Sequence, residues 1–499
     1  MNILLFWVPS NNGKLPMPLG LLSVSKIIEK CGFNAKIFDS IDFGCNEEDG
    51  VGFEKIYRVI EDYKPSIIGY GGITTSYGET KKLSFKIRKR YPEIIQIAGG
   101  PLSSVSKLLL TNAKIDAVFH GETEISLPIF LEKITCGKLY DKTPGISCLL
   151  NGQIMRNLPA EQTRNLDEAS FLPYHLIDVS KYLHSIEDVL HSFKFGLKNN
   201  PFFSEILGKI GNTKALFPLT TSRGCTHKCS FCYRHVRGIR QNSVGYVINH
   251  LKYIQKQYNV NGFEFCDELF NTKQEWVLEF CDAIEKEKMN IIYRILGARA
   301  DKINKLILQR LQKTGCFMIN YGQESGSDAI LKEYGKGISA KQNKETTLLT
   351  KEMGIHNTVQ LVIGSPGETL DTIYESIQFL KDVDAYQYSA NYLIPFPETP
   401  IWKYVEEKGL VKNLETYLNC VASGPGQPQI NLTQVPDKQW KRWGHLIRKE
   451  LRLYYYRKKK PSLYFFYYVY FNFVYNFTHP VPGKIKRLFK KVLPFVNLN

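Results

Sequence analysis

The chain has 499 residues, 43% of them hydrophobic and 23% charged, which excludes a disordered polymer and favours two or three globular domains. Its formal net charge of +17 favours an anionic partner, such as a nucleic acid, a lipid surface or a phosphorylated substrate. Eleven cysteines, three of them tightly clustered, fit a reducing compartment and metal binding better than a disulfide framework.

Expected strands and helices alternate over residues 1–140. The first six residues carry neither a basic leader nor a small-residue cleavage site, so we expect no signal peptide and a cytoplasmic protein. The expected strands are 3–8, 35–38, 66–70, 94–98 and 117–120, and the expected helices are 19–31, 53–63, 79–90 and 125–134. This order is typical of an α/β domain with a Rossmann-like, doubly wound parallel sheet, whose ligand lies at the carboxyl ends of the strands.

The loops after three of these strands are rich in glycine and hydroxyl residues. Glycine lets the backbone approach a large flat ligand, while hydroxyl and free N–H groups bond its amides and phosphate. The candidate contacts are Thr74, Ser76, Gly99, Gly100, Gly121 and Glu122. The alternative is that these are ordinary glycine turns of a domain that binds no ligand there.

Residues 141–213 are expected to form a linker and a variable insertion. Asn151-Gly152 is a turn signal within a short ribbon. Residues 180–213 are basic and aromatic, and either a variable helical insertion or a lid or membrane-facing surface would fit them. The aromatic residues among these lysines are Phe193, Phe195, Phe202 and Phe203.

Three cysteines follow the expected strand 215–219 at C-x3-C-x2-C spacing: Cys225, Cys229 and Cys232. Thiolates suit iron–sulfur clusters and zinc, and such closely spaced cysteines converge on one metal centre only from an irregular loop. Three protein ligands leave one iron of a cubane open, which indicates a catalytic metal site and not a structural one. The alternative is a zinc knuckle of a nucleic-acid-binding protein, which needs a fourth ligand such as His227 or His235.

The stretch 221–234 resembles the cluster loop of the radical S-adenosylmethionine (SAM) superfamily. The resemblance rests on the cysteine spacing, on Arg223-Gly224 before the first cysteine and on Phe231 before the last. It implies a [4Fe-4S] cluster on the three cysteines, with SAM bound to the fourth iron and cleaved to a 5′-deoxyadenosyl radical. It also implies an electron donor such as flavodoxin or ferredoxin.

The amino-terminal loops resemble the cobalamin-binding domain that precedes the cluster loop in one large radical SAM subfamily. Pro18-Leu19-Gly20, Gly99-Gly100-Pro101 and Gly121-Glu122-x-Glu124 carry this resemblance, which implies cobalamin as a further cofactor. Leu102 stands where that family usually has His, and no D-x-H-x-x-G signature follows the first strand. Bound cobalamin would therefore lack a protein histidine on its lower face.

Strands and helices alternate again over residues 214–430. The expected strands are 215–219, 263–266, 291–296, 317–321, 358–363 and 388–395, and the expected helices include 244–258, 275–287, 304–313 and 370–383. Six parallel strands indicate an incomplete (β/α)6, TIM-like barrel with its functional groups at the carboxyl ends of the strands.

Polar segments follow five of these strands where the barrel predicts a site. They are Asp267-Glu268, Arg299, 322–326, 364–369 and 395–400; each alone is compatible with a capped turn, but the set favours a site. The resemblance to the radical SAM barrel implies SAM contacts by Glu324 and Ser325 (methionyl or ribose groups), Arg299 (carboxylate), and Gly364, Gly367 and Tyr233 (adenine). For Asp267 and Glu268, contact with SAM and contact with substrate both stay open.

Residues 431–499 are expected to form a helical, basic and aromatic extension. Its aromatic run, 463–475, is shorter than the ~20 residues needed to span a bilayer. Tyrosines and flanking lysines favour the surface of an anionic membrane, while packing onto the barrel is an equal alternative. RNA binding is not expected, because no RNA-binding domain signature accompanies the run.

We therefore predict a cobalamin-dependent radical SAM enzyme that methylates an unactivated carbon of a small-molecule or lipid-like substrate, at or near the inner face of the membrane. Relatives such as the anaerobic magnesium-protoporphyrin ester cyclases run oxidation, cyclisation or carbon–carbon bond formation on the same scaffold. The alternative is thus a radical SAM enzyme without bound cobalamin that catalyses one of these reactions.

Overall fold

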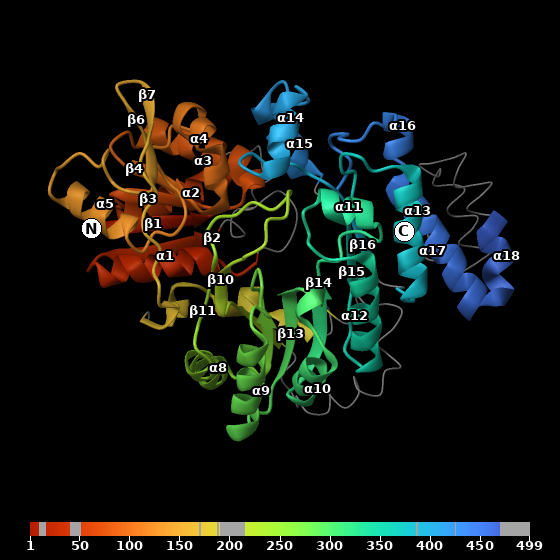
Figure 1. Ribbon diagram of the computed structural model, residues 1–499. Coiled ribbons are helices and arrows are strands. Elements are labelled where there is room, and N and C mark those ends of the chain that lie inside the picture. Colours follow the sequence, from red (N-terminus) through yellow and green to blue (C-terminus); the bar gives the residue numbers. More distant parts are fainter. Residues whose placement is uncertain are drawn as a thin grey trace.

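The computed structural model describes residues 1–8, 16–39, 51–168, 171–186, 189, 215–385, 388–424 and 426–469 (Figure 1). The aromatic residues Phe193, Phe195, Phe202 and Phe203, and the tail beyond residue 469, lie outside the described residues. Two largely parallel sheets, one from each half of the chain, form the body of the molecule.

The amino-terminal sheet is doubly wound, as the sequence predicted. Five parallel strands lie in the order β2 (Asn34–Asp39), β1 (Asn2–Trp7), β3 (Ile67–Gly71), β4 (Ile95–Gly99) and β5 (Ala117–Phe119). The ribbon β6 (Ile146–Leu150) and β7 (Gln153–Arg156) continues this sheet with antiparallel pairing. The strand order reverses between β1 and β3, which is where such sheets bind ligands.

Both faces of this sheet are covered because its strands are apolar on both sides. In β1, Ile3 and Leu5 belong to one buried cluster and Leu4 and Phe6 to another, since neighbouring side chains point to opposite faces. One face is covered by α1 (Leu19–Lys30) and α5 (Ser126–Thr135) and the other by α2 (Val51–Tyr63), α3 (Tyr77–Arg90) and α4 (Ser106–Asn112). The short helix α4 was not predicted.

The second half of the chain forms the incomplete barrel. Strands β9 (Ala215–Leu219), β12 (Gly262–Phe265), β13 (Ile292–Ala298) and β14 (Cys316–Tyr321) pair in parallel, as do β15 (Val359–Ile363) and β16 (Tyr388–Tyr392). Isolated bridges such as Glu324 to Leu361 join the two groups. These are the six parallel strands that the sequence predicted. A short strand that was not predicted, β8 (His184–Ser185), pairs antiparallel with β9.

Helices cover the outside of the barrel and extend it at the carboxyl end. The barrel helices are α8 (Val244–Tyr258), α9 (Gln274–Lys286), α10 (Lys305–Lys313), α11 (Asp328–Glu333), α12 (Ala340–Glu352) and α13 (Leu370–Asp382). The carboxyl-terminal helices are α14 (Pro400–Glu407), α15 (Leu414–Ser423), α16 (Asp437–Trp440), α17 (Trp443–Lys459) and α18 (Pro461–Val469). Trp443 and Ile447 of α17 are buried with Ile373 and Ile377 of α13. No helix within the described part of the chain is long and apolar enough to cross a membrane.

Candidate active site

The three cysteines lie on one loop, residues 225–232, which we call the cluster loop. It connects the antiparallel strands β10 (Ser222–Gly224) and β11 (Ile239–Gln241). Gly224 has a φ of +85°, and a Cβ atom there would collide with the Gly238 carbonyl, so this approach of the two strands requires glycine. Cys229 is buried, Cys225 half-buried and Cys232 exposed. The sequence placed the thiols correctly on one irregular loop.

The chemistry of the cluster loop fits an iron–sulfur cluster. A hydrogen bond from Cys232 lowers the pKa of the Cys229 thiol, and the cations Lys336 and Arg299 add to this effect. In the described part of the chain, no group of three His, Cys, Asp or Glu side chains surrounds a single metal-ion position. Three thiolates on one irregular loop are the ligand set that suits a cubane with one open iron.

Beside the cluster loop, Glu324 and Lys336 form a buried ion pair. Their charged atoms lie 2.9 Å apart and both side chains are 11% exposed. Glu324 also has a φ of +62°, a conformation that costs free energy in a residue other than glycine and is often kept at functional sites. Lys336 was missed at the sequence level, although its position between Gly335 and Gly337 marks an unusual turn.

Ser325 and Arg299 already have partners within the protein. The Ser325 hydroxyl lies 3.2 Å from the Ser376 hydroxyl on α13 and is buried. The Arg299 guanidinium donates two hydrogen bonds to Asp301, at 2.8 and 3.0 Å. Arg299 nevertheless lies close enough to act on the electrostatics of Cys225. Their roles as SAM contacts stay predictions.

The turn after β15 combines left-handed glycines with unpaired buried groups. Gly364 and Gly367 have φ of +96° and +77°, and a Cβ atom at Gly364 would lie 2.8 Å from Nε1 of Trp440. The Glu368 carboxylate accepts hydrogen bonds from the N–H groups of Gly364 and Ser365, and burial raises its pKa to about 7. Within the described structure, Glu368 Oε1 and Trp440 Nε1 have no hydrogen-bond partner. A polar ligand such as SAM can complete such a site.

The neighbouring acids Asp267 and Glu268 have different environments. Asp267 is buried and accepts hydrogen bonds from the Thr221 N–H (2.8 Å) and the Ser222 hydroxyl (2.6 Å), so it anchors the chain entering β10. Burial raises the pKa of Asp267 to about 6. Glu268 is exposed and is the one of the two that is open to a ligand.

The inner side of the barrel carries a charged cluster that sequence reasoning missed. Glu264 of β12 pairs with Arg294 of β13 and lies 3.2 Å from His184 of β8. Phe263 and Phe265, its neighbours in the strand, belong to the outer hydrophobic core. Glu264 therefore points to the inner side, because strand side chains alternate.

At the carboxyl edge of the amino-terminal sheet, the hydroxyl groups predicted to contact a ligand are hydrogen-bonded within the protein. The Thr74 hydroxyl lies 2.9 Å from the Ser104 hydroxyl, and the Ser76 hydroxyl donates to the Val8 carbonyl at 3.0 Å. Two neighbours in the same loop were missed: Ile73 is 47% exposed, and the buried Thr75 hydroxyl has no partner within the described structure. An exposed apolar side chain beside an unpaired hydroxyl fits a large ligand such as cobalamin on this edge.

The predicted glycines shape this edge through their backbones. Gly100 and Gly121 adopt left-handed φ of +70° and +72°. A Cβ atom at Gly100 would lie 3.6 Å from the Gly72 carbonyl, so the loops after β3 and β4 approach each other through their backbones. Gly99 has an extended backbone, and its Cβ position lies 3.5 Å from Phe119.

Glu122 is fully engaged by two arginines of the cluster region. Its carboxylate accepts hydrogen bonds from Arg223 (3.1 Å) and from Arg240 (2.7 and 2.8 Å), and its side chain is 5% exposed. Burial alone would raise its pKa, but Arg240 and Arg223 together lower it. A second contact joins the two halves of the site, because the Tyr233 and Ser103 hydroxyls lie 3.1 Å apart.

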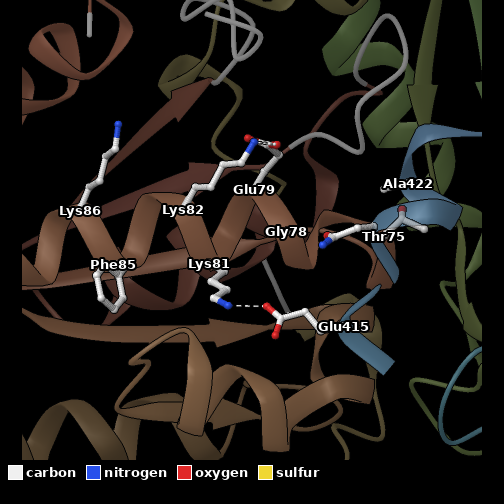
Figure 2. A pocket seen from close by; sticks show the side chains of 10 residues that line it. Thr75, Gly78, Glu79, Lys81, Lys82, Phe85, Lys86, Glu415 and Ala422 are labelled. Atoms are coloured by element: carbon white, nitrogen blue, oxygen red, sulfur yellow. Dashed lines mark hydrogen bonds and ion pairs between the residues drawn. The ribbon is translucent and has the colours of Figure 1, made fainter. Parts of the chain in front are cut away.

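A groove of about 570 Å³ separates α3 from α15 (Figure 2). Its lysines have partners within the protein: Lys81 pairs with Glu415, and Lys82 with Glu79 at 2.8 Å. Lys86 lies over the ring of Phe53. The groove thus belongs to the contact between the amino-terminal half and the carboxyl-terminal helices.

Two family models match the chain. A B12 binding domain matches residues 12–131, and the Radical SAM superfamily matches residues 219–380, which include the cluster loop. An uncharacterized methyltransferase from Pyrococcus horikoshii is 25% identical over 467 residues, 91% of this chain and 92% of the relative. An anaerobic magnesium-protoporphyrin IX monomethyl ester cyclase from Synechocystis is 25% identical over 410 residues, 79% of this chain and 74% of the relative.

The fold is also similar to a solved structure. The radical S-adenosylmethionine methyltransferase TsrM from Kitasatospora setae is 18% identical, with a TM-score of 0.62. The likeness covers 82% of this chain and 77% of that one.

Proposed function

The chain is a radical SAM enzyme with an amino-terminal B12-binding domain, and on that premise we propose that it methylates an unactivated carbon of a small-molecule or lipid-like substrate. Its cofactors are a [4Fe-4S] cluster, SAM and cobalamin. When bound, the cluster and SAM supply a 5′-deoxyadenosyl radical, and cobalamin supplies a methyl group.

One observation carries this proposal. The cluster loop contacts the carboxyl edge of the amino-terminal sheet directly, through Tyr233 to Ser103 and through Arg223 to Glu122. A radical generator and a methyl donor must reach the same substrate carbon, which requires their sites to face each other within a few ångströms. The contact between the two loops supports such an arrangement.

Different residues of the chain would hold each of the three cofactors. Cys225, Cys229 and Cys232 would hold the cluster. The pair Glu324–Lys336 and the turn at Gly364 would hold SAM, whose amino, carboxylate and adenine groups suit fixed charges and free polar atoms. The loops after β3 and β4, with Ile73, Thr75 and Gly100, would hold cobalamin.

Cofactor content tests the proposal first. We expect anaerobically reconstituted protein supplied with hydroxocobalamin to retain about four irons and one cobalt per chain. The Cys229→Ala variant should lose its iron and keep its cobalt. Iron without cobalt would favour the alternative, a radical SAM enzyme that binds no cobalamin, and would contradict the proposed methyl transfer.

The products of SAM then separate methylation from the other reactions of this scaffold. A methyl group taken from SAM leaves S-adenosylhomocysteine, whereas the radical reaction leaves 5′-deoxyadenosine. We expect the reduced enzyme, supplied with substrate-containing extract, to form both products. Formation of 5′-deoxyadenosine alone would favour oxidation, cyclisation or carbon–carbon bond formation.

We further propose that α18 and the end of α17 contact an anionic membrane. Phe465 and Tyr468 of α18 are 68% and 44% exposed, and α18 lies at the outer end of the molecule (Figure 1). Arg457 and Lys459 in the last turn of α17, and Lys460 directly after it, are exposed. Exposed aromatic side chains beside cations match the headgroup region of anionic lipid.

Vesicle binding tests this surface. We expect full-length protein to bind phosphatidylglycerol vesicles and not phosphatidylcholine vesicles, and Phe465→Ser with Lys459→Glu to reduce this binding about tenfold. The matched control is Leu306→Ser with Lys305→Glu, which changes an exposed apolar–basic pair on α10. Equal loss in both variants would mean that net charge alone drives binding and would refute the surface.

A further inference from the structure

The cluster loop is held against the amino-terminal sheet at both of its ends. Arg223, two residues before Cys225, donates hydrogen bonds to Glu122 (3.1 Å) and Glu124 (2.5 Å) in the loop after β5. At the other end, Tyr233 follows Cys232 directly and contacts Ser103 in the segment after β4. Two loops at the expected cobalamin edge therefore fix the segments that carry the cysteines.

Glu122 is the central group of this contact. Arg223 and Arg240 stand directly opposite each other in the β10–β11 ribbon, where two like charges repel. The buried Glu122 carboxylate lies between them and accepts hydrogen bonds from both. Without its charge, Arg223 would keep Glu124, but Arg240 would face it with no carboxylate partner in the described structure, and the ribbon that precedes Cys225 would lose its link to Glu122.

The position of the loop after β5 affects the cluster loop through Glu122. Gly121, just before it, adopts a left-handed φ of +72°, and its Cβ position lies 3.6 Å from the His235 carbonyl beyond the cluster loop. A ligand that orders the Gly121–Glu122 segment also orders Glu122 relative to Arg223. The two sites thus share one rigid connection.

We propose that Glu122 is a positioning residue through which cobalamin and SAM strengthen each other's binding. The inference rests on the proposed function, because it requires both cofactors. The Glu122 carboxylate is engaged by Arg223 and Arg240 and acts through them. Because such coupling is reciprocal, cobalamin raises the affinity for SAM by the same factor by which SAM raises the affinity for cobalamin.

Equilibrium dialysis of SAM measures this coupling without turnover. The cluster-reconstituted protein is kept without reductant, so that SAM is not cleaved, and its Kd for SAM is measured with and without hydroxocobalamin. We expect cobalamin to lower this Kd about tenfold in the wild type, within the usual range of coupling between sites. In Glu122→Gln the ratio should fall to about one while the iron content stays unchanged.

A second variant makes the test independent of how well Glu122→Gln folds. Arg240→Gln keeps the contact between Arg223 and Glu122 but removes one of the two facing cations. We expect it to retain part of the coupling. If either Arg240→Gln or Glu122→Gln keeps the full wild-type ratio, the positioning role is refuted.

The matched control is Glu415→Gln, which breaks another contact between the two halves of the chain. Glu415 on α15 accepts hydrogen bonds from Lys81 (2.5 Å), Tyr77 (3.1 Å) and Asn112 (3.2 Å). It lines the groove that Thr75 also lines (Figure 2), but it lies outside the loops after β4 and β5 that contact the cluster region. We expect this variant to keep the wild-type ratio. An equal loss here would show that coupling depends on general domain contact and would overturn the role of Glu122.

The outcome also separates this inference from the proposed function. A wild-type protein that retains no cobalt refutes the cobalamin assignment itself, and the coupling with it. A wild-type protein that retains cobalt but binds SAM equally with and without it refutes only the coupling.

Discussion

Polar groups are satisfied differently on the two sides of the proposed active site. On the barrel side, Glu324 has a strained backbone, and Glu368 Oε1 and Trp440 Nε1 lack partners in the described structure. On the amino-terminal side, the hydroxyls of Thr74 and Ser76 are bonded within the protein, and of the three hydroxyls in this loop only that of Thr75 lacks a partner in the described structure. We therefore expect the barrel side to bind charged and polar ligand groups, and the amino-terminal side to bind its ligand mainly through its backbone and the Thr75 hydroxyl.

The largest expected effect concerns the buried pair on the barrel side. Lys336→Met leaves Glu324 buried without its cation, which should lower the free energy of unfolding by about 3–5 kcal/mol. In the amino-terminal half, the Lys82 side chain is 65% exposed, so Lys82→Met breaks its pair with Glu79 at a position open to water and should cost less than about 1 kcal/mol. Urea unfolding of both variants measures the difference. Equal costs would remove the contrast between the two sides.

The same glycine substitution should have unequal effects on the two sides. An alanine at Gly224 would collide with the Gly238 carbonyl and must also adopt a positive φ, so we expect a loss of about 2 kcal/mol or more and a lower iron content. At Gly100 the φ is also positive, but the nearest atom is the Gly72 carbonyl at 3.6 Å. Gly100→Ala should therefore cost only about 1–2 kcal/mol and leave iron unchanged.

Iron analysis and thermal unfolding check this pair of variants. If Gly100→Ala lost as much iron as Gly224→Ala, the two loops would be more strongly coupled than these contacts imply. That result would itself support a connection through Tyr233 and Ser103.

The two buried acids should give opposite pH dependences. The pKa of Glu368 is raised to about 7 by burial, so between about pH 4.5 and 7 the folded state keeps a proton that the unfolded state has lost. Its contribution to stability therefore falls as the pH rises through this window, by at most about 1.4 kcal/mol per unit. The pKa of Glu122 is lowered by its arginines, so its contribution falls as the pH drops below the ordinary pKa of Glu.

Thermal unfolding of Glu368→Gln and Glu122→Gln against the wild type tests these signs. The difference between wild type and Glu368→Gln should change most from pH 5 to 7, and that for Glu122→Gln below pH 4.5. A flat difference for Glu368→Gln over its window would mean that the carboxyl is not held protonated.

Sequence reasoning located elements and loops well because their signals are local. The helix expected at 244–258 has those bounds in the structure, since Ser243 caps its start and Asn259 takes a left-handed conformation at its end. The cluster loop was predictable because the C-x3-C-x2-C spacing of its cysteines is visible in the sequence itself. The directions of side chains were not predictable, because neighbouring residues of one loop, such as Thr74 and Thr75, share a composition but face different partners.

Side-chain contacts between residues far apart along the chain were also not predictable from the sequence. Lys336 was missed because its partner Glu324 is brought to it by the barrel and not by any local pattern. The same holds for Glu122, where the glycine-rich loop suggested a ligand contact and the structure shows two arginines more than a hundred residues away along the chain.

The smallest expected effect tests which hydroxyl of the β3 loop serves the ligand. Thr74→Val breaks hydrogen bonds to Ser104 and the Pro101 carbonyl and should cost about 1–3 kcal/mol, with cobalamin retention unchanged. Thr75→Val removes a buried hydroxyl that has no partner in the described structure, so stability should stay within about 0.5 kcal/mol or rise. Equilibrium dialysis with hydroxocobalamin should show weaker binding only for Thr75→Val. Weaker binding in Thr74→Val alone would restore Thr74 as the contact and remove the distinction between the two sides of the site.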